Sequence, residues 1–220
     1  MKVTKEQAQQ NRQALLDAAG RLFKKHGIDG IGVADVSREA GLTPGALYKH
    51  FADKQDLAAQ AFSHAFRRGF DRVNAPRPGA ERSVDTYLKV YLNPRIRDDL
   101  EAGCPLIATA CETARQGELL SQSFADAFVE FRTGLESVLP DTGDAAQRSA
   151  LASVFVAAFV GATAISRGVL KADRALADEV LDQVRGVLAS LPTVPDDKGA
   201  DGNGADGNGA DGTSSAPGPR

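Results

Sequence analysis

Three histidines and two cysteines are the side chains best suited to chemistry, and their spacing forms no catalytic set. His26, His50 and His64 lie far apart on segments that favour helix, without the short intervals that bring metal ligands together. The chain also lacks a glycine-rich phosphate loop followed by lysine. The sequence therefore predicts a protein that is not an enzyme and that has no metal site and no cofactor.

Cys104 stands in a Gly-Cys-Pro step, which predicts the start of a helix because proline suits the first helical position. A thiol at a helix N-cap lies at the positive end of the helix dipole, which lowers its pKa and favours the thiolate. Cys104 is therefore a candidate sensor, with Cys111 as a structural residue. The alternative is that Cys104 is a small apolar residue in the core. Seven residues of helix separate the two cysteines, which is too far for a disulfide within it.

The segment 33–57 predicts two short helices joined by a tight turn, followed by the start of a third helix. Gly41 suits the left-handed position that ends a helix, Thr43 suits an N-cap, and Pro44 suits the first helical position. We expect the second helix to run from Pro44 to about Phe51. This is the helix-turn-helix pattern, whose second helix can enter the DNA major groove.

At these residues the chain resembles the TetR/AcrR family of transcriptional regulators. The resemblance implies a helix-turn-helix DNA-binding domain over residues 1–55, with the motif at about 32–51 and the likeness extending to about 72. Double-stranded operator DNA is the partner that it implies. The chain departs from the family pattern at Gly32, where a Thr or Ser hydroxyl is usual. The matching text is Asp35-Val36, Ala40-Gly41-Leu42-Thr43-Pro44-Gly45-Ala46-Leu47-Tyr48, His50-Phe51 and Lys54.

The resemblance also assigns contacts with DNA residue by residue. The N-terminal edge of the second motif helix faces base edges or phosphates, the residues after it face the groove, and the start of the next helix meets phosphate. For the lysines the alternative is a solvated face, and for His50 it is an ordinary helix-end histidine. The assigned residues are Ser37, Arg38, Thr43, Pro44, Gly45, Ala46, Tyr48, Lys49, His50 and Lys54.

Charge is distributed unevenly along the chain. The net charge is −3, but residues 1–55 sum to +3 and the remaining residues to −6. A basic N-terminal part on an acidic body suits contact with phosphate. The sequence has no run of eighteen apolar residues, and its N-terminus is polar. We therefore expect no membrane span and no signal peptide, hence a cytoplasmic protein.

The rest of the chain predicts further helices and no strand. We expect an all-α protein of about nine helices, in which residues 56–192 form a C-terminal ligand-binding and dimerisation domain. From Gly199 the chain repeats the unit Gly-Ala-Asp-Gly-Asn, and no aromatic or branched apolar side chain follows Asp196. We therefore expect residues 193–220 to form a disordered tail. The expected helices are 5–26, two in the motif, 54–73, 80–92, 105–115, 119–139, 145–170 and 174–191.

Apolar side chains at helical spacing suggest both a core and a cavity. Phe62, Phe66 and Phe70 are four residues apart and form one stripe, which packs on the second domain and could also form the floor of a ligand cavity. The candidate residues for contact with an effector or for sensing are Phe62, Phe66, Tyr91 and Phe128, together with Cys104 and Cys111.

Small residues in the segment 144–170 suggest where a second subunit packs. Ala150, Ala157 and Ala164 recur every seven residues, and Gly161 lies on a nearby face. TetR-like proteins dimerise through their last two long helices, so the resemblance implies a homodimer. The alternative is an ordinary intrachain core.

Together these features predict a dimeric repressor of transcription that a small molecule, or an electrophile or oxidant, releases from its operator. The alternative of a different class is a helical dimeric interaction module that does not bind DNA.

Overall fold

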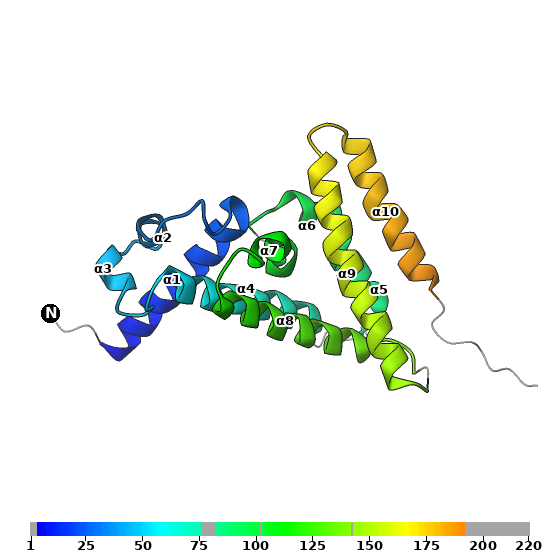
Figure 1. Cartoon of the computed structure of the whole chain (residues 1–220), viewed down its shortest axis with the longest axis horizontal. Helices are drawn as coiled ribbons and strands as arrows, with labels where there is room; N and C mark the ends of the chain where they lie inside the picture. Colours follow the sequence, from blue (N-terminus) through cyan, green and yellow to red (C-terminus); the bar gives the residue numbers. More distant parts are fainter. Residues whose placement is uncertain (1–3, 76–81, 102, 142, 192–220) are drawn as a thin grey trace, which may run out of the picture.

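The computed structural model describes residues 4–75, 82–101, 103–141 and 143–191, which fold into ten helices with no strand in these ranges. The all-α prediction is confirmed. The tail 193–220 and the predicted helix start at residue 80 lie outside the described residues. Figure 1 shows the arrangement of the helices. They are α1 (Lys5–His26), α2 (Val33–Glu39), α3 (Pro44–Leu47), α4 (Lys54–Asn74), α5 (Val84–Tyr91), α6 (Pro94–Asp98), α7 (Pro105–Thr113), α8 (Glu118–Glu136), α9 (Ala145–Val169) and α10 (Arg174–Ser190).

Apart from shifts of a few residues at helix ends, the structure adds one helix and shortens another. The added helix is α6, where the sequence suggests an irregular segment; the Asn93 side chain accepts hydrogen bonds from the backbone N–H groups of Arg95 and Ile96 and so caps it. The second motif helix, α3, ends at Leu47 rather than near Phe51. The residues after it continue as turns, in which the N–H of His50 donates to the carbonyl of Leu47 over 2.9 Å.

Helices α1 to α3 and the first turns of α4 form the head, which occupies one end of the molecule in Figure 1. Gly41 has a φ of 68°, so it ends α2 in the left-handed conformation that glycine adopts without strain. The apolar residues predicted to join α1 to the motif all pack together. They are Leu15, Leu16, Leu22, Phe23, Val33, Val36, Leu42, Leu47 and Phe51.

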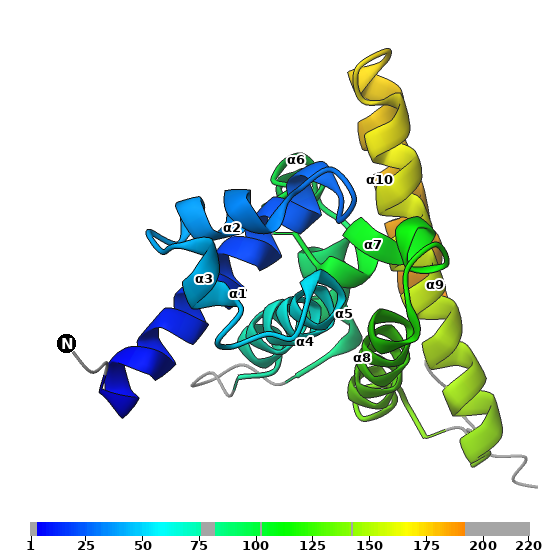
Figure 2. The same cartoon turned by 60° about the vertical axis from the view of Figure 1, so that its left-hand side comes forward.

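Helix α4 lies between the head and the remaining helices, which form the body (α5–α10), as Figure 2 shows from a second side. Leu57 and Ala61, near its start, are buried where α4 packs against α1, and Phe62, Phe66 and Phe70 contact aromatic rings of α8 in the body. The ring centroids of Phe62 and Phe124 of α8 are 5.8 Å apart. One continuous helix therefore belongs to two cores.

Aromatic rings form the centre of the body. Phe131 of α8 lies 4.7 Å from Tyr91 of α5 and 6.0 Å from Phe159 of α9, measured between ring centroids. Tyr91 and Phe159 stack at 5.5 Å. All three residues are buried, so this cluster fixes α5, α8 and α9 relative to one another.

Helix α9 is long and apolar enough to cross a membrane by length and composition alone, although it contains no uninterrupted run of eighteen apolar residues. Within the fold α9 packs against α8 and α10, and 39% of its most apolar window is buried. A core helix passes the same test, which makes it weak evidence for a membrane span.

Polar contacts join the end of α1 to α7 in the body. One carboxylate oxygen of Glu112 accepts hydrogen bonds from the backbone N–H groups of Ile28, over 2.6 Å, and Asp29, over 3.4 Å. The Lys24 ammonium donates to the carbonyl of Gly103, just before α7, over 3.0 Å. The head is thus held to the body at α7 as well as through α4.

We predict that Glu112→Ala lowers the free energy of unfolding by about 1–3 kcal/mol, because it leaves the part-buried N–H of Ile28 without its acceptor. Urea denaturation of the full chain measures this change. The matched control is Glu130→Ala on α8, since Glu130 makes no hydrogen bond or ion pair within the described part of the chain. Equal stability of the two variants would show that the Glu112 contact contributes nothing.

Candidate nucleic-acid interface and ligand cavity

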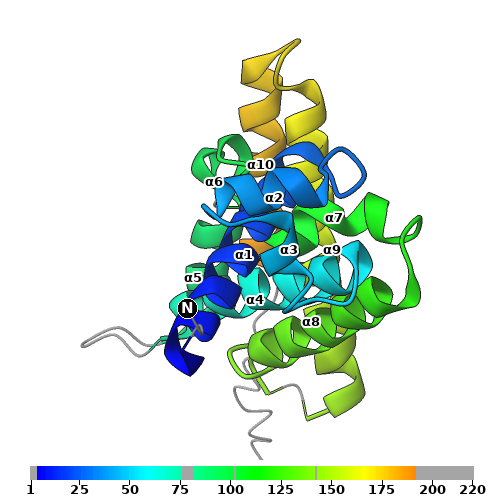
Figure 3. The same ribbon diagram turned by 90° about the vertical axis from the view of Figure 1, so that its left-hand side faces the viewer.

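The helix-turn-helix is built as its sequence predicts. The Thr43 hydroxyl accepts a hydrogen bond from the N–H of Ala46 over 3.3 Å, and Pro44 occupies the first turn of α3. Leu47, the last residue of α3, is fully buried and anchors the helix to the head core. Its neighbours therefore face outward, and Figure 3 shows α2 and α3 at the surface of the head.

Most of the residues assigned to DNA are available on this surface. Thr43, Pro44, Gly45 and Lys49 are exposed, and Tyr48 is 57% exposed, which is unusual for so large an apolar ring. Ala46, His50 and Lys54 are partly exposed. A tyrosine held in water in this way is suited to contact another molecule.

Gly45 is not required by the packing of the head. A Cβ atom added there meets no atom within 4 Å, and its backbone does not have the positive φ that favours glycine. A glycine in a helix is less stable than alanine by about 1 kcal/mol. The open space over Gly45 suits close approach of a DNA backbone.

Two of the assigned DNA contacts need correction or refinement. Ser37, which the resemblance places beside the DNA backbone on the first motif helix, is fully buried, and its hydroxyl donates to the carbonyl of Val33 over 2.9 Å, so it does not face DNA in this conformation. Arg38 is exposed, and its guanidinium pairs with Asp35 over 2.5 Å. A phosphate would have to replace that carboxylate.

The start of α4 is already capped by carboxylates. Asp53 accepts from the N–H of Asp56, and the Asp56 side chain accepts from the N–H of Ala52, each over 2.9 Å. These two carboxylates accept the backbone hydrogen bonds that a phosphate would otherwise accept at the N-terminus of α4. Lys54 would therefore have to contact DNA through its ammonium group rather than through the helix dipole.

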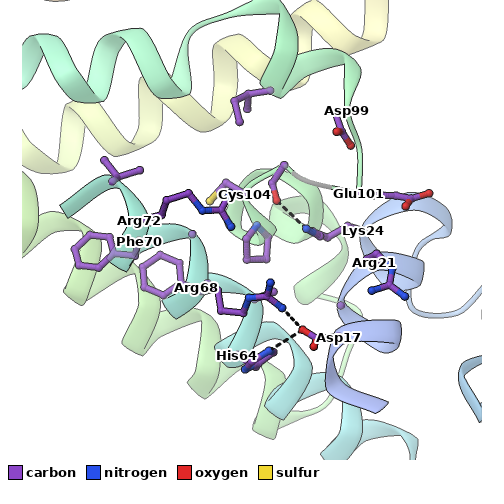
Figure 4. A pocket seen from close by; sticks show the side chains of 18 of the residues that line it. Asp17, Arg21, Lys24, His64, Arg68, Phe70, Arg72, Asp99, Glu101 and Cys104 are labelled. Carbon is purple, nitrogen blue, oxygen red and sulfur yellow. Dashed lines mark hydrogen bonds and ion pairs between the residues drawn. The ribbon is translucent and has the colours of Figure 1, made fainter. Parts of the chain in front are cut away.

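A cavity of about 480 Å³ lies where the head meets the body. Its walls come from α1, α4, the end of α5, α6 and the segment that leads into α7, and Figure 4 shows the charged side chains around it. This volume lies in the range of small-molecule sites, about 300–1,000 Å³.

Only part of the predicted effector set lines this cavity. Phe66, Tyr91 and Cys104 do so. Phe62 instead packs against Phe124, and Phe128 lies under the guanidinium of Arg132, 5.8 Å from it, so neither of these two predictions holds for this cavity. Spacing by four places a residue on one face of a helix, but it does not say which neighbour covers that face.

The charged wall of the cavity was not predicted from the sequence. Lys24 of α1 and Arg68 and Arg72 of α4 line it together with Asp17. Arg68 and Arg72 are four residues apart, so they share a face of α4, which was the available signal. Nothing in the sequence indicated that α1 would lie opposite them.

The prediction of a low pKa at Cys104 is wrong. Cys104 is the N-cap of α7, as expected, but its burial raises the pKa of the thiol to about 11. The backbone N–H groups of Ile107 and Leu106 act to lower that pKa, and burial outweighs them. Cys111, predicted to be structural, is exposed.

The predicted dimer residues lie on the outer side of α9. Ala150, Ala157 and Ala164 are exposed and Gly161 is partly exposed, while the opposite side of α9 is buried in the body. Larger apolar side chains are also exposed on α9 and α10. They are Val154 (53% exposed) and Ile165 (58%) of α9, with Leu176 (42%) and Val187 (61%) of α10. Exposed apolar side chains of this size do not stabilise a monomer, so they are consistent with a surface that a second subunit covers.

We predict that N-ethylmaleimide modifies Cys111 of the folded protein at pH 7 and leaves Cys104 largely unmodified. With a pKa of about 11, on the order of one Cys104 thiol in ten thousand is a thiolate at that pH. Peptide mapping by mass spectrometry follows both sites, and the unfolded protein in urea, where both react, is the control. Equal rates at the two sites in the folded protein would contradict this assignment.

Two family models match the chain. One, described as "Bacterial regulatory proteins, tetR family", matches residues 15–61. The other, described as "Transcriptional regulator LmrA/YxaF-like, C-terminal domain", matches residues 84–178. The chain is similar to the transcriptional regulator LmrA of Bacillus subtilis, at 30% identity over 68% of this chain and 82% of that protein. It is 44% identical to AcrR of Shigella flexneri over 57 residues, so it spans only 26% of that relative.

Solved structures agree in fold. A TetR-family regulator from Cytophaga hutchinsonii has a TM-score of 0.68 at 21% identity, over 87% of this chain and 98% of that one. The reduced form of Escherichia coli NemR has a TM-score of 0.66 at 16% identity, over 81% and 94%. At these identities the likeness concerns the fold alone. From the family models and the extent of the LmrA match, the chain belongs to the TetR family, whose members are non-enzymatic, DNA-binding regulators of transcription.

Proposed function

We propose that this chain is a homodimeric repressor that leaves its operator when a small molecule occupies the cavity between head and body. The observation that supports this most is the origin of the cavity wall. Helices α1 and α4 line it; α1 packs against α2 of the helix-turn-helix, and α4 packs against α1 and directly follows the motif in the chain. A ligand cannot enter here without touching the elements that orient α3.

The mechanism is a shift between two arrangements of the heads. In a dimer on DNA, two recognition helices must lie about 34–36 Å apart to enter successive major grooves. A ligand that prefers another spacing lowers the affinity for DNA by the ratio of its affinities for the two arrangements. The effect depends on this preference and not on how tightly the ligand binds.

Hydrogen bonds connect the cavity to the proposed dimer helices. Arg167 of α9 donates to the carbonyl of Ile96 over 2.8 Å and to that of Arg97 over 3.0 Å. The Arg97 side chain is fully buried and pairs with Asp98 and with Asp178 of α10. Since Ile96 also lines the cavity, α6 is tied to α9 and α10 on one side and meets the ligand on the other.

The alternative is an interaction module that does not bind DNA. A binding experiment with DNA taken from the region upstream of the gene distinguishes the two functions. We predict that the wild-type protein binds this DNA and that Lys49→Ala lowers the slope of log affinity against log salt. The expected change is about 0.9 for each phosphate that the lysine neutralises, hence about 1.8 for a dimer. Gly45→Ala should lower affinity with little change in slope, because it blocks approach without removing charge. Fluorescence anisotropy at several salt concentrations measures both.

The matched control is Lys171→Ala, which removes an exposed positive charge after α9, in the body. If Lys49→Ala behaves as Lys171→Ala does, the assigned surface is not the one that meets DNA. A wild-type protein that is dimeric but binds no upstream DNA would favour the interaction module.

We further predict that Ala157→Arg gives monomers, because a guanidinium would be placed in the centre of the exposed apolar stripe on α9 and α10. Light scattering reports the mass, and Ala125→Arg on the exposed side of α8 is the control. A dimeric Ala157→Arg protein would place the interface elsewhere.

A further inference from the structure

We propose that the cavity binds an amphipathic anion, a molecule with an aromatic body and one acidic group, and that Arg72 and Lys24 bind the acidic group. This deepens the proposed function, on which it rests, by naming the chemical class of the effector. The assignment comes from the apolar wall, the two cations without a carboxylate partner, and the positions of those cations.

The apolar wall of the cavity is built mainly from aromatic rings that pack against one another. Phe66 and Phe70 of α4 stack with their ring centroids 5.4 Å apart, and Phe66 is 2% exposed. Tyr91 of α5 is 4% exposed and lies at the same cavity. Val73, Val90 and Ile96 complete this wall. Flat aromatic surface favours a flat apolar body.

Several of the charged groups at the cavity neutralise one another. Arg68 and His64 of α4 both pair with Asp17 of α1. The other pairs reach outside the cavity: Arg21 with Glu39 over 3.0 Å, and Glu101 with Lys25 over 2.6 Å. These groups therefore add little net charge to the cavity.

Among the described residues that line the cavity, Arg72 and Lys24 are the cations that form no ion pair with a carboxylate. Arg72 makes no hydrogen bond or ion pair within the described ranges and is exposed, so its guanidinium can move to a ligand. Lys24 donates to a neutral carbonyl, that of Gly103, and burial lowers the pKa of its ammonium group. Asp99 and Glu101 act in the opposite direction on that pKa. Summed over the acidic and basic side chains that line the cavity, the formal net charge is about +1 with His64 neutral.

The positions of these groups orient the ligand. Figure 4 shows Arg72 and Lys24 pointing into the space between α4 and α1, with Phe70 on the α4 side. An acidic group between the two cations leaves the aromatic body against Phe70, which is partly exposed, in front of the buried rings of Phe66 and Tyr91. A carboxylate or sulfonate would then join α1 of the head to the C-terminal half of α4 through charge-assisted hydrogen bonds.

Two fluorescent probes with the same body test this assignment. 8-Anilinonaphthalene-1-sulfonate carries an anionic group, and N-phenyl-1-naphthylamine is its neutral counterpart. We expect the full chain to bind one sulfonate probe per subunit. Arg72→Gln should weaken its binding about tenfold, because the variant cannot make a hydrogen bond between two charged groups. The same variant should bind the neutral probe as the wild type does.

The control variant is Arg67→Gln, since Arg67 is also exposed on α4 but does not line the cavity. It should bind both probes as the wild type does. The assignment is overturned if Arg72→Gln leaves sulfonate binding unchanged, if both variants lose it equally, or if neither probe binds at a fixed stoichiometry.

A third arm separates this proposal from the proposed function. The sulfonate probe at saturation should lower the affinity of the wild type for upstream DNA, with less effect on Arg72→Gln. If the probe binds through Arg72 and DNA affinity does not change, the cavity is not the effector site and this inference fails. Failure of the free wild-type protein to bind upstream DNA overturns the repressor function instead, whatever the probes show.

Discussion

The shared position of α4 is the constraint on which the rest of the structure depends. Leu57 and Ala61 of this helix are buried against the head, and Phe62 and Phe66 are buried against the body. A well-packed core resists small displacements of a helix, so neither end of α4 can shift without repacking apolar side chains. The head therefore cannot turn independently of the body, and any change in its orientation must involve α4.

The cavity lies beside that constraint, and polar contacts set its other walls. Glu112 of α7 accepts hydrogen bonds from the backbone N–H groups of Ile28 and Asp29, just after α1, and Arg167 of α9 donates to the carbonyls of Ile96 and Arg97 in α6. Both attachments are hydrogen bonds to backbone, which have strict geometry and can exchange for water when helices shift. The body is held rigid by its aromatic centre, whereas its junction with the head is polar. This combination suits two alternative arrangements of the heads, because the polar junction can change while the body does not.

The fold and the DNA-binding surface could be predicted because they depend on local sequence. Gly41, Thr43 and Pro44 specify the turn through backbone preferences, and the bounds of α1 follow from its apolar face and its caps. The errors concern tertiary surroundings. Ser37 is buried by the packing of the head, and burial reverses the effect of the N-cap on Cys104. The charged wall of the cavity needs α1 beside α4, a contact that no single helix encodes.

The distance between the two heads of the dimer is the quantity that tests the proposed mechanism most directly. A spin label at Ala52→Cys, in a Cys111→Ser background, reports it by double electron–electron resonance, because residue 52 is exposed next to α3 and Cys104 should stay unlabelled. We predict one narrow distance distribution on operator DNA and a different distribution when the anionic probe fills the cavity. The same distribution in both states would contradict the claim that the cavity acts through the orientation of the heads.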